Sequence, residues 1–239
     1  MKASLGSTLT RFCVFSALFV VMVFSLHSFD AKVAKDVKQE RLYFPSGHFL
    51  KEASLGFREV NADYLWFRFI QYYGSYAKGF NNFKHFELLI DGITTLDPKF
   101  VEAYHFASLV TWSDLGKPYE SIEILKRGIL HNPDTARLPF QIGMIYSAVA
   151  NDFPRAALWF NEAAKCSDAT DLERRFAAFS SYRSGDNLGS LELWFELYES
   201  TDQPGMKKLA EKMIFIIHEK MQKSETEVSS TPTFNQPGA

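Results

Sequence analysis

A pattern of small and apolar residues recurs every 34 to 35 positions, and it constrains the fold of this chain more than any other feature. The template is Ser121, Leu125 and Gly128, which lie near the end of a helix-like segment. Equivalent triples lie 35 residues before it, 35 residues after it and a further 34 residues on: Phe86, Ile90 and Ile93; Ala156, Phe160 and Ala163; Ser190, Trp194 and Leu197. Because such periods are typical of stacked helical units, we predict an all-α body of helical hairpins between about residues 64 and 203.

Gly128 interrupts a segment of good helix formers, where a glycine costs about 0.5–1 kcal/mol relative to alanine. Ala163 occupies the equivalent position one unit later. Small residues at fixed positions allow the helices of stacked hairpins to approach closely. We therefore predict that Gly128 lies in a close contact between helices.

Two of these units resemble the tetratricopeptide repeat. The third unit carries Ile142-Gly143, Tyr146, Ala156, Phe160 and Ala163, and the second carries Ala107-Ser108, Ser121, Leu125, Gly128 and Pro133. The first unit departs from the family pattern at Phe86 and Ile93, and the fourth lacks a leucine-glycine step in its first helix. The resemblance spans roughly residues 64 to 203. It implies a right-handed superhelical stack of hairpins whose first helices line a concave groove that binds other proteins.

Residues 12 to 29 carry no Asp, Glu, Lys or Arg across 18 positions, and Lys2 and Arg11 precede them. A run of this length can just span a membrane. It is longer than the apolar region of most cleaved signals, and no good cleavage site follows it. We predict an uncleaved transmembrane anchor with the body on the exported, periplasmic-type side. A cleaved secretory signal and a buried helix are the alternatives.

The remaining segments complete the predicted organisation. Residues 1–30 are the anchor or signal, residues 31–47 a linker, and residues 48–222 one helical domain. Residues 42–60 should add a helix ahead of the first unit. Residues 205–222 should form a capping helix with one apolar stripe: Met206, Leu209, Met213, Ile217 and Met221. Residues 223–239 lack periodicity and are rich in Ser, Thr, Pro and Glu, so they should be disordered.

The sequence contains no motif that points to catalysis. The six histidines show no metal-ligand spacing, and no phosphate-binding loop or nucleophile elbow is present. The two cysteines, Cys13 and Cys166, are far apart. A net charge of −2 without a basic run gives no case for nucleic acid. We therefore expect no catalytic, cofactor-binding or metal-binding residues and no enzyme, although a site assembled from distant residues is the competing hypothesis.

The family resemblance places a candidate partner-binding surface on the first helix of each unit. Its residues are Arg68, Gln71, Ser75 and Lys78; His105, Leu109 and Trp112; and Phe140 and Met144. The family's carboxylate clamp of Lys and Asn is missing, so a partner segment with apolar anchors and one acidic group fits better. We predict a scaffold tethered to a membrane, with a structural subunit of a membrane complex as the alternative. A third interpretation is that Arg68 and Lys78 only solvate their helix and that Phe140 and Met144 are core.

Overall fold

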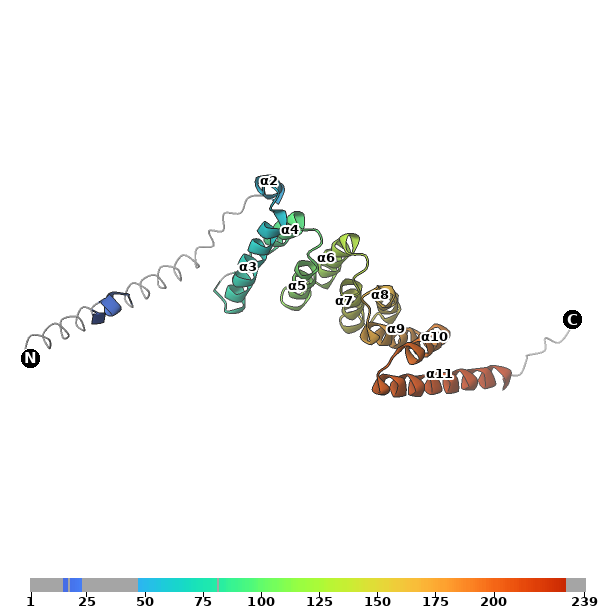
Figure 1. The fold of residues 1–239 in the computed structure, drawn as a ribbon. Helices are drawn as coiled ribbons and strands as arrows, with labels where there is room; N and C mark the ends of the chain where they lie inside the picture. The colour runs from blue at the N-terminus through green and yellow to red at the C-terminus, as the bar shows by residue number, and fades with distance from the viewer. Residues whose placement is uncertain (1–14, 17, 23–46, 81, 231–239) are drawn as a thin grey trace, which may run out of the picture. The chain divides into compact units, whose positions relative to one another are not determined.

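The computed structural model describes residues 15–16, 18–22, 47–80 and 82–230, and all regular secondary structure within them is helical (Figure 1). This confirms the predicted all-α class. The chain divides into two compact units, Met1–Leu96 and Asp97–Ala239. The organisation into one helical domain over residues 48–222 stays a prediction. The superhelical arrangement stays a prediction.

The first unit holds α2 (Gly47–Ala53), α3 (Arg58–Ala77) and α4 (Phe86–Leu96), and α4 packs against both other helices. The expected extra helix ahead of the first repeat is therefore α2. Phe69 of α3 forms a cluster with two further rings, with centroids 6.1 Å from Phe83 and 5.9 Å from Phe86. Phe86 and Ile93 are both buried. Large side chains thus fill the positions where the repeat pattern expects small ones.

The second unit is a succession of hairpins followed by one long helix (Figure 1). Its helices are α5 (Val101–Ser113), α6 (Pro118–His131), α7 (Arg137–Ala148), α8 (Phe153–Lys165), α9 (Asp171–Ser184), α10 (Asn187–Ser200) and α11 (Pro204–Ser230). Each helix packs against the next one along the chain, and α5 also contacts α7. The second helices begin at Pro118, Phe153 and Asn187, which are 35 and then 34 residues apart. The predicted hairpin period is therefore confirmed in this unit.

Two glycines of the second unit lie where helices meet. A Cβ atom at Gly128 would lie 2.8 Å from Leu138 Cδ1 and 2.8 Å from Tyr104 Cγ. A Cβ atom at Gly143 would lie 2.7 Å from Phe160 Cδ1. All three distances are far shorter than an ordinary contact between carbon atoms. The predicted close helix contact at Gly128 is confirmed, and Gly143 makes a second one.

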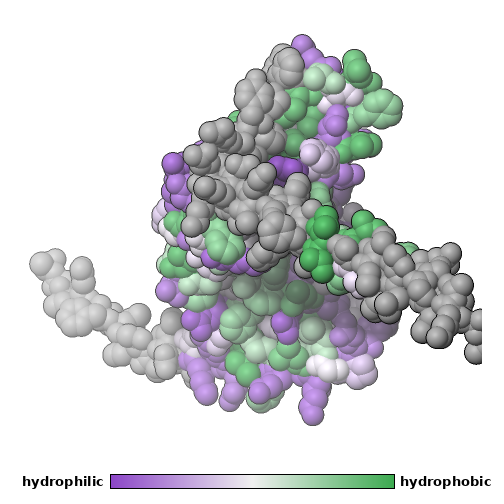
Figure 2. Space-filling model, turned by 90° about the vertical axis from the view of Figure 1, so that its left-hand side faces the viewer, coloured by the Kyte–Doolittle hydropathy of each residue, from purple (hydrophilic) through white to green (hydrophobic). Residues whose placement is uncertain are grey.

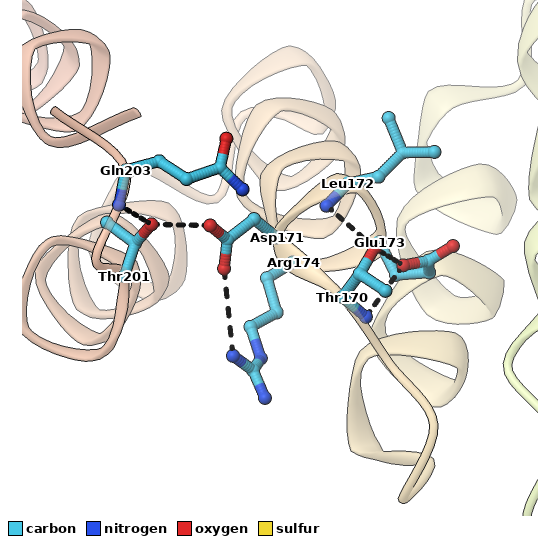
Figure 3. Close-up of polar contacts among 7 residues, drawn as sticks. All are labelled: Thr170, Asp171, Leu172, Glu173, Arg174, Thr201 and Gln203. Carbon is cyan, nitrogen blue, oxygen red and sulfur yellow. Dashed lines mark hydrogen bonds and ion pairs between the residues drawn. The ribbon is translucent and has the colours of Figure 1, made fainter. Parts of the chain in front are cut away.

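A polar contact closes the open end of each of the three hairpins. The Asn132 side-chain amide donates to the Pro98 carbonyl at 3.3 Å, between the entry and exit of the α5–α6 hairpin. The Ala136 N–H donates to Asp168 Oδ1 at 2.7 Å in the α7–α8 hairpin. In the α9–α10 hairpin, the Thr201 hydroxyl donates to the Asp171 carboxylate (Figure 3). The entry and exit turns of each hairpin are therefore held together by side chains outside the apolar core.

The α9–α10 hairpin forms although its first helix lacks a leucine-glycine step. Ala177 and Ala178 lie at that place, and both are fully buried. A capping box starts the helix, since the Thr170 N–H donates to the Glu173 carboxylate at 2.9 Å and the Leu172 N–H to the Thr170 hydroxyl at 3.2 Å (Figure 3). Small residues other than glycine therefore satisfy the same packing requirement.

The long helix α11 covers the last hairpin, as predicted for the capping helix. Ala210 and Ile217 are buried in a cluster with Trp194 and Leu197 of α10. The helix continues to Ser230, so the prediction of a disordered tail from residue 223 is wrong for residues 223–230. An ion pair one turn apart, with Lys223 Nζ 3.6 Å from Glu219 Oε1, supports this extension. Residues 231–239 lie outside the described residues.

Among the described residues, no helix combines the length and the apolar composition that a membrane span requires. Most of the predicted anchor, residues 12–29, lies outside the described residues. Residues 15–16 and 18–22 of it are described, and they are helical and exposed. The predicted linker, residues 31–47, also lies outside them except for Gly47.

Candidate functional site

Four predicted site residues belong to the first unit, on or directly after α3. Arg68 and Gln71 are exposed, and so is Lys78, which follows the last residue of the helix. Ser75 is half-buried, and its hydroxyl donates to the Gln71 carbonyl at 3.1 Å. Helical spacing places these residues on the side of α3 away from the buried Phe69. They form an accessible polar surface on the C-terminal half of the helix.

The N-terminal half of the same side of α3 is apolar, which the sequence interpretation missed. Its residues are Phe57, Val60, Tyr64 and Phe67, hereafter the α3 stripe, and each is between 58% and 68% exposed. Their spacing of three and four residues places them on one side of a helix. The periodicity was hidden because the opposite side of α3 is apolar too. Along its outer side, the helix therefore changes from apolar to polar.

In the second unit, polar side chains connect the first helices of two neighbouring hairpins. Arg137 Nη1 of α7 lies 3.5 Å from Glu102 Oε1 of α5. The Gln141 side-chain amide donates to the His105 carbonyl at 3.4 Å. The ion pair is about half exposed on both sides and therefore adds little stability. The two contacts join α5 to α7 through side chains.

His105 lies at the centre of this connection. Burial, with the Arg137 guanidinium as a smaller cause, lowers the pKa of His105 to about 4, and Glu102 acts weakly in the opposite direction. The imidazole is therefore neutral at neutral pH, with one nitrogen that donates and one that accepts. This site offers hydrogen bonds without a net charge.

The apolar part of the candidate site is only partly accessible. Leu109 on α5 is 38% exposed. Trp112 is half-buried against the core cluster of α5, α6 and α7, and no described residue accepts a hydrogen bond from its indole N–H. Phe140 and Met144 of α7 are half-buried against a second core cluster. The Phe140 ring lies 5.2 Å from that of Phe160, so part of its surface belongs to the core.

Five of the predicted site residues thus lie on α5 and α7, two helices that contact each other. Hereafter the α5–α7 surface denotes Glu102, His105, Leu109, Trp112, Arg137, Phe140 and Met144. The other four predicted residues lie in the first unit, and the continuity of the two sets stays a prediction. Glu102 and Arg137 join the site through the ion pair.

The described residues offer little for metal or thiol chemistry. None of their His, Cys, Asp and Glu side chains form a group of three or more that could hold a metal ion. Burial, followed by nearby carboxylates with Asp168 first, raises the pKa of the Cys166 thiol. Its Sγ lies 3.4 Å from the Glu162 carbonyl. The thiol is therefore held in its protonated, weakly nucleophilic form.

Comparison with known proteins gives a weak likeness. No protein-family model and no curated protein matches the chain. The chain is similar to a solved structure titled "Crystal structure of MamA", with 18% identity over 64% of this chain and 95% of that one and a TM-score of 0.38. It is similar to another, titled "Crystal structure of MamA protein", with 16% identity over 68% and 93% and a TM-score of 0.37. At these TM-scores the likeness carries no argument, so the class rests on the hairpins themselves: an all-α protein built of repeated helical hairpins.

Proposed function

We propose that this chain is a non-catalytic protein-interaction scaffold of the tetratricopeptide type, tethered to a membrane by residues 12–29. The observation that supports the interaction role most directly is the α5–α7 surface, where the first helices of two neighbouring hairpins lie in contact. In stacked repeats, equivalent side chains of successive first helices lie side by side, and such surfaces are used for binding. The repeated hairpins and the family resemblance of the sequence support the same role.

The partner that fits the α5–α7 surface is a protein segment with apolar anchors. Leu109 and Met144 lie about one turn beyond the hydrogen bond that joins Gln141 to the His105 carbonyl, so both are available to one bound segment. A few side chains near the centre of an interface usually supply most of the binding energy. The neutral His105 and the Glu102–Arg137 pair add polar contacts beside them. Arg68 and Lys78 on α3 are separate candidates for contact with an acidic group.

A photo-reactive amino acid at Leu109 tests this function in the full chain. Leu109 is accessible, so the substitution should leave the fold intact, as checked by thermal unfolding. The matched control is the same amino acid at Leu130 of α6, a second helix, where the side chain is 79% exposed. We expect one discrete crosslinked product from position 109 and none from position 130. Equal products from both positions, or none from either, would contradict the proposal.

A structural subunit of a larger membrane complex is the second candidate, favoured by the exposed apolar residues of the α3 stripe. Pull-down of the full chain distinguishes the two roles. A subunit should purify in one complex of fixed composition, whereas a scaffold should release its partner when the α5–α7 surface is altered.

A further inference from the structure

The α3 stripe is an exposed apolar face on an otherwise well-packed helix. Its four residues are spaced by three, four and three positions, so they follow one side of α3 from its N-cap residue, Phe57, to Phe67. The other side of the helix is buried, with Ala62 and Phe69 fully so. Contiguous apolar surface of this kind marks a site of interaction with a protein or a membrane. On the face of the molecule drawn in Figure 2, hydrophobic residues (green) are exposed between hydrophilic ones (purple).

We propose that the α3 stripe lies in the interface of the lipid bilayer to which residues 12–29 tether the chain. The proposal rests on that tether. The first unit then touches the membrane along the N-terminal half of α3, with Gln71 and Lys78 at the other end of the same side in water. The second unit, which carries the proposed partner-binding surface, follows the first unit in the chain and is therefore attached to the bilayer through it.

The length of chain before α2 supports the lipid bilayer as the partner of the α3 stripe. Residues 30–46 connect the apolar run to α2, and 17 residues reach at most about 60 Å when fully extended. A tethered face is therefore confined to a thin layer of solution next to the bilayer, where its effective concentration is high. The α3 stripe begins only a few residues after α2. Together with α2, it is the part of the folded body nearest the tether along the chain.

The side chains of the α3 stripe also suit a bilayer interface. Tyrosine is enriched at the level of the lipid headgroups, and phenylalanine is common among the side chains that surface helices bury at the boundary with the acyl chains. The charges beside the stripe balance, because Arg58 and Arg68 are matched by Glu59 and Asp63, all four exposed. The contact should therefore depend on apolar burial, need no anionic lipid and change little with salt concentration.

The test uses the full chain in phosphatidylcholine vesicles that contain a lipid with a spin label on its acyl chain. An environment-sensitive fluorophore is attached at Phe67→Cys, after Cys13→Ser and Cys166→Ser. The matched control is the same fluorophore at Glu87→Cys, an exposed position on α4 of the same unit. We expect the emission at position 67 to shift to the blue and to be quenched several-fold more than at position 87. Adding Tyr64→Asp should abolish the quenching at position 67.

Vesicle flotation separates the failure of this inference from the failure of the tether. If the chain floats with the vesicles but the label at position 67 is quenched no more than the control, the inference is wrong and the tether stands. A protein partner would then be the better occupant of the stripe. If the chain does not float, both the tether and the inference are wrong. Flotation that persists with Tyr64→Asp while the quenching is lost supports both.

Discussion

At the scale of single residues, two glycines in similar helical positions have opposite surroundings. A Cβ atom at Gly128 would meet Leu138 and Tyr104 at 2.8 Å, whereas a Cβ atom at Gly74 of α3 would meet nothing within 4 Å. Alanine is favoured over glycine inside helices by about 0.8–1 kcal/mol. The effect of the added methyl group therefore depends on packing at position 128 and on helix propensity at position 74.

Substitution of Gly128 should destabilise the fold in proportion to the size of the new side chain. We expect Gly128→Leu to lower the free energy of unfolding by about 1–3 kcal/mol through overpacking, and Gly128→Ala to lower it by less. Gly74→Ala, the control, should leave it unchanged or raise it. Urea unfolding measures all three. A Gly128→Leu variant as stable as the wild type would show that the helices separate there without cost.

His105 should make stability depend on pH in mildly acidic solution. Its pKa falls from 6.5 in the unfolded chain to about 4 in the folded one, so between these values the unfolded state binds more protons. The free energy of unfolding should therefore decrease as the pH falls from 6.5 to 4. Below pH 4, His105 should cause no further decrease. His105→Gln should flatten the change in this window, measured as the unfolding midpoint against pH. Identical slopes for both proteins would contradict this role of burial.

At the scale of helices and hairpins, the contacts at the open ends are testable one by one. Asp168 accepts the Ala136 N–H at 2.7 Å and the Thr135 hydroxyl at 3.4 Å. Asp168→Ala leaves that N–H without its charged acceptor, which should cost about 1–2 kcal/mol. The neighbouring exposed Ser167→Ala should stay within about 0.5 kcal/mol of the wild type. Chemical unfolding measures the stability of both variants. Equal stability of the two would show that the contacts of Asp168 do not stabilise the hairpin.

The hairpins could be predicted from the sequence because their spacing and small residues follow from close helix packing, as at Gly128. The α3 stripe could not, because α3 is apolar on two sides and periodicity gives no sign of which side faces solvent. Residues 223–230 were missed because the helix continues there without apolar periodicity, which was the signal used to place the other helices. The partial burial of Phe140 and Met144 depends on rings from α8 and α9, which no local pattern encodes.

At the scale of the whole molecule, the proposed tether and the folded body should separate cleanly. Deleting residues 1–29 removes no residue of helices α2 to α11. We expect the shortened chain to keep the melting temperature of the full chain and to leave carbonate-washed membranes, since carbonate also strips a peripheral contact through α3. Continued retention after the wash would show that residues 12–29 are not the main attachment.

The central claim is that the α5–α7 surface binds a protein partner, and Leu109→Asp tests it most directly. The substitution removes an accessible apolar anchor and adds a charge, while Leu130→Asp adds the same charge to a more exposed position on α6. The measurement is the amount of crosslink-identified partner that copurifies with each full-length variant, after both are shown to melt like the wild type. We predict a loss of at least about tenfold for Leu109→Asp, as expected for an anchor worth more than 1.4 kcal/mol, and no loss for Leu130→Asp. Equal recovery with the two variants would contradict the account.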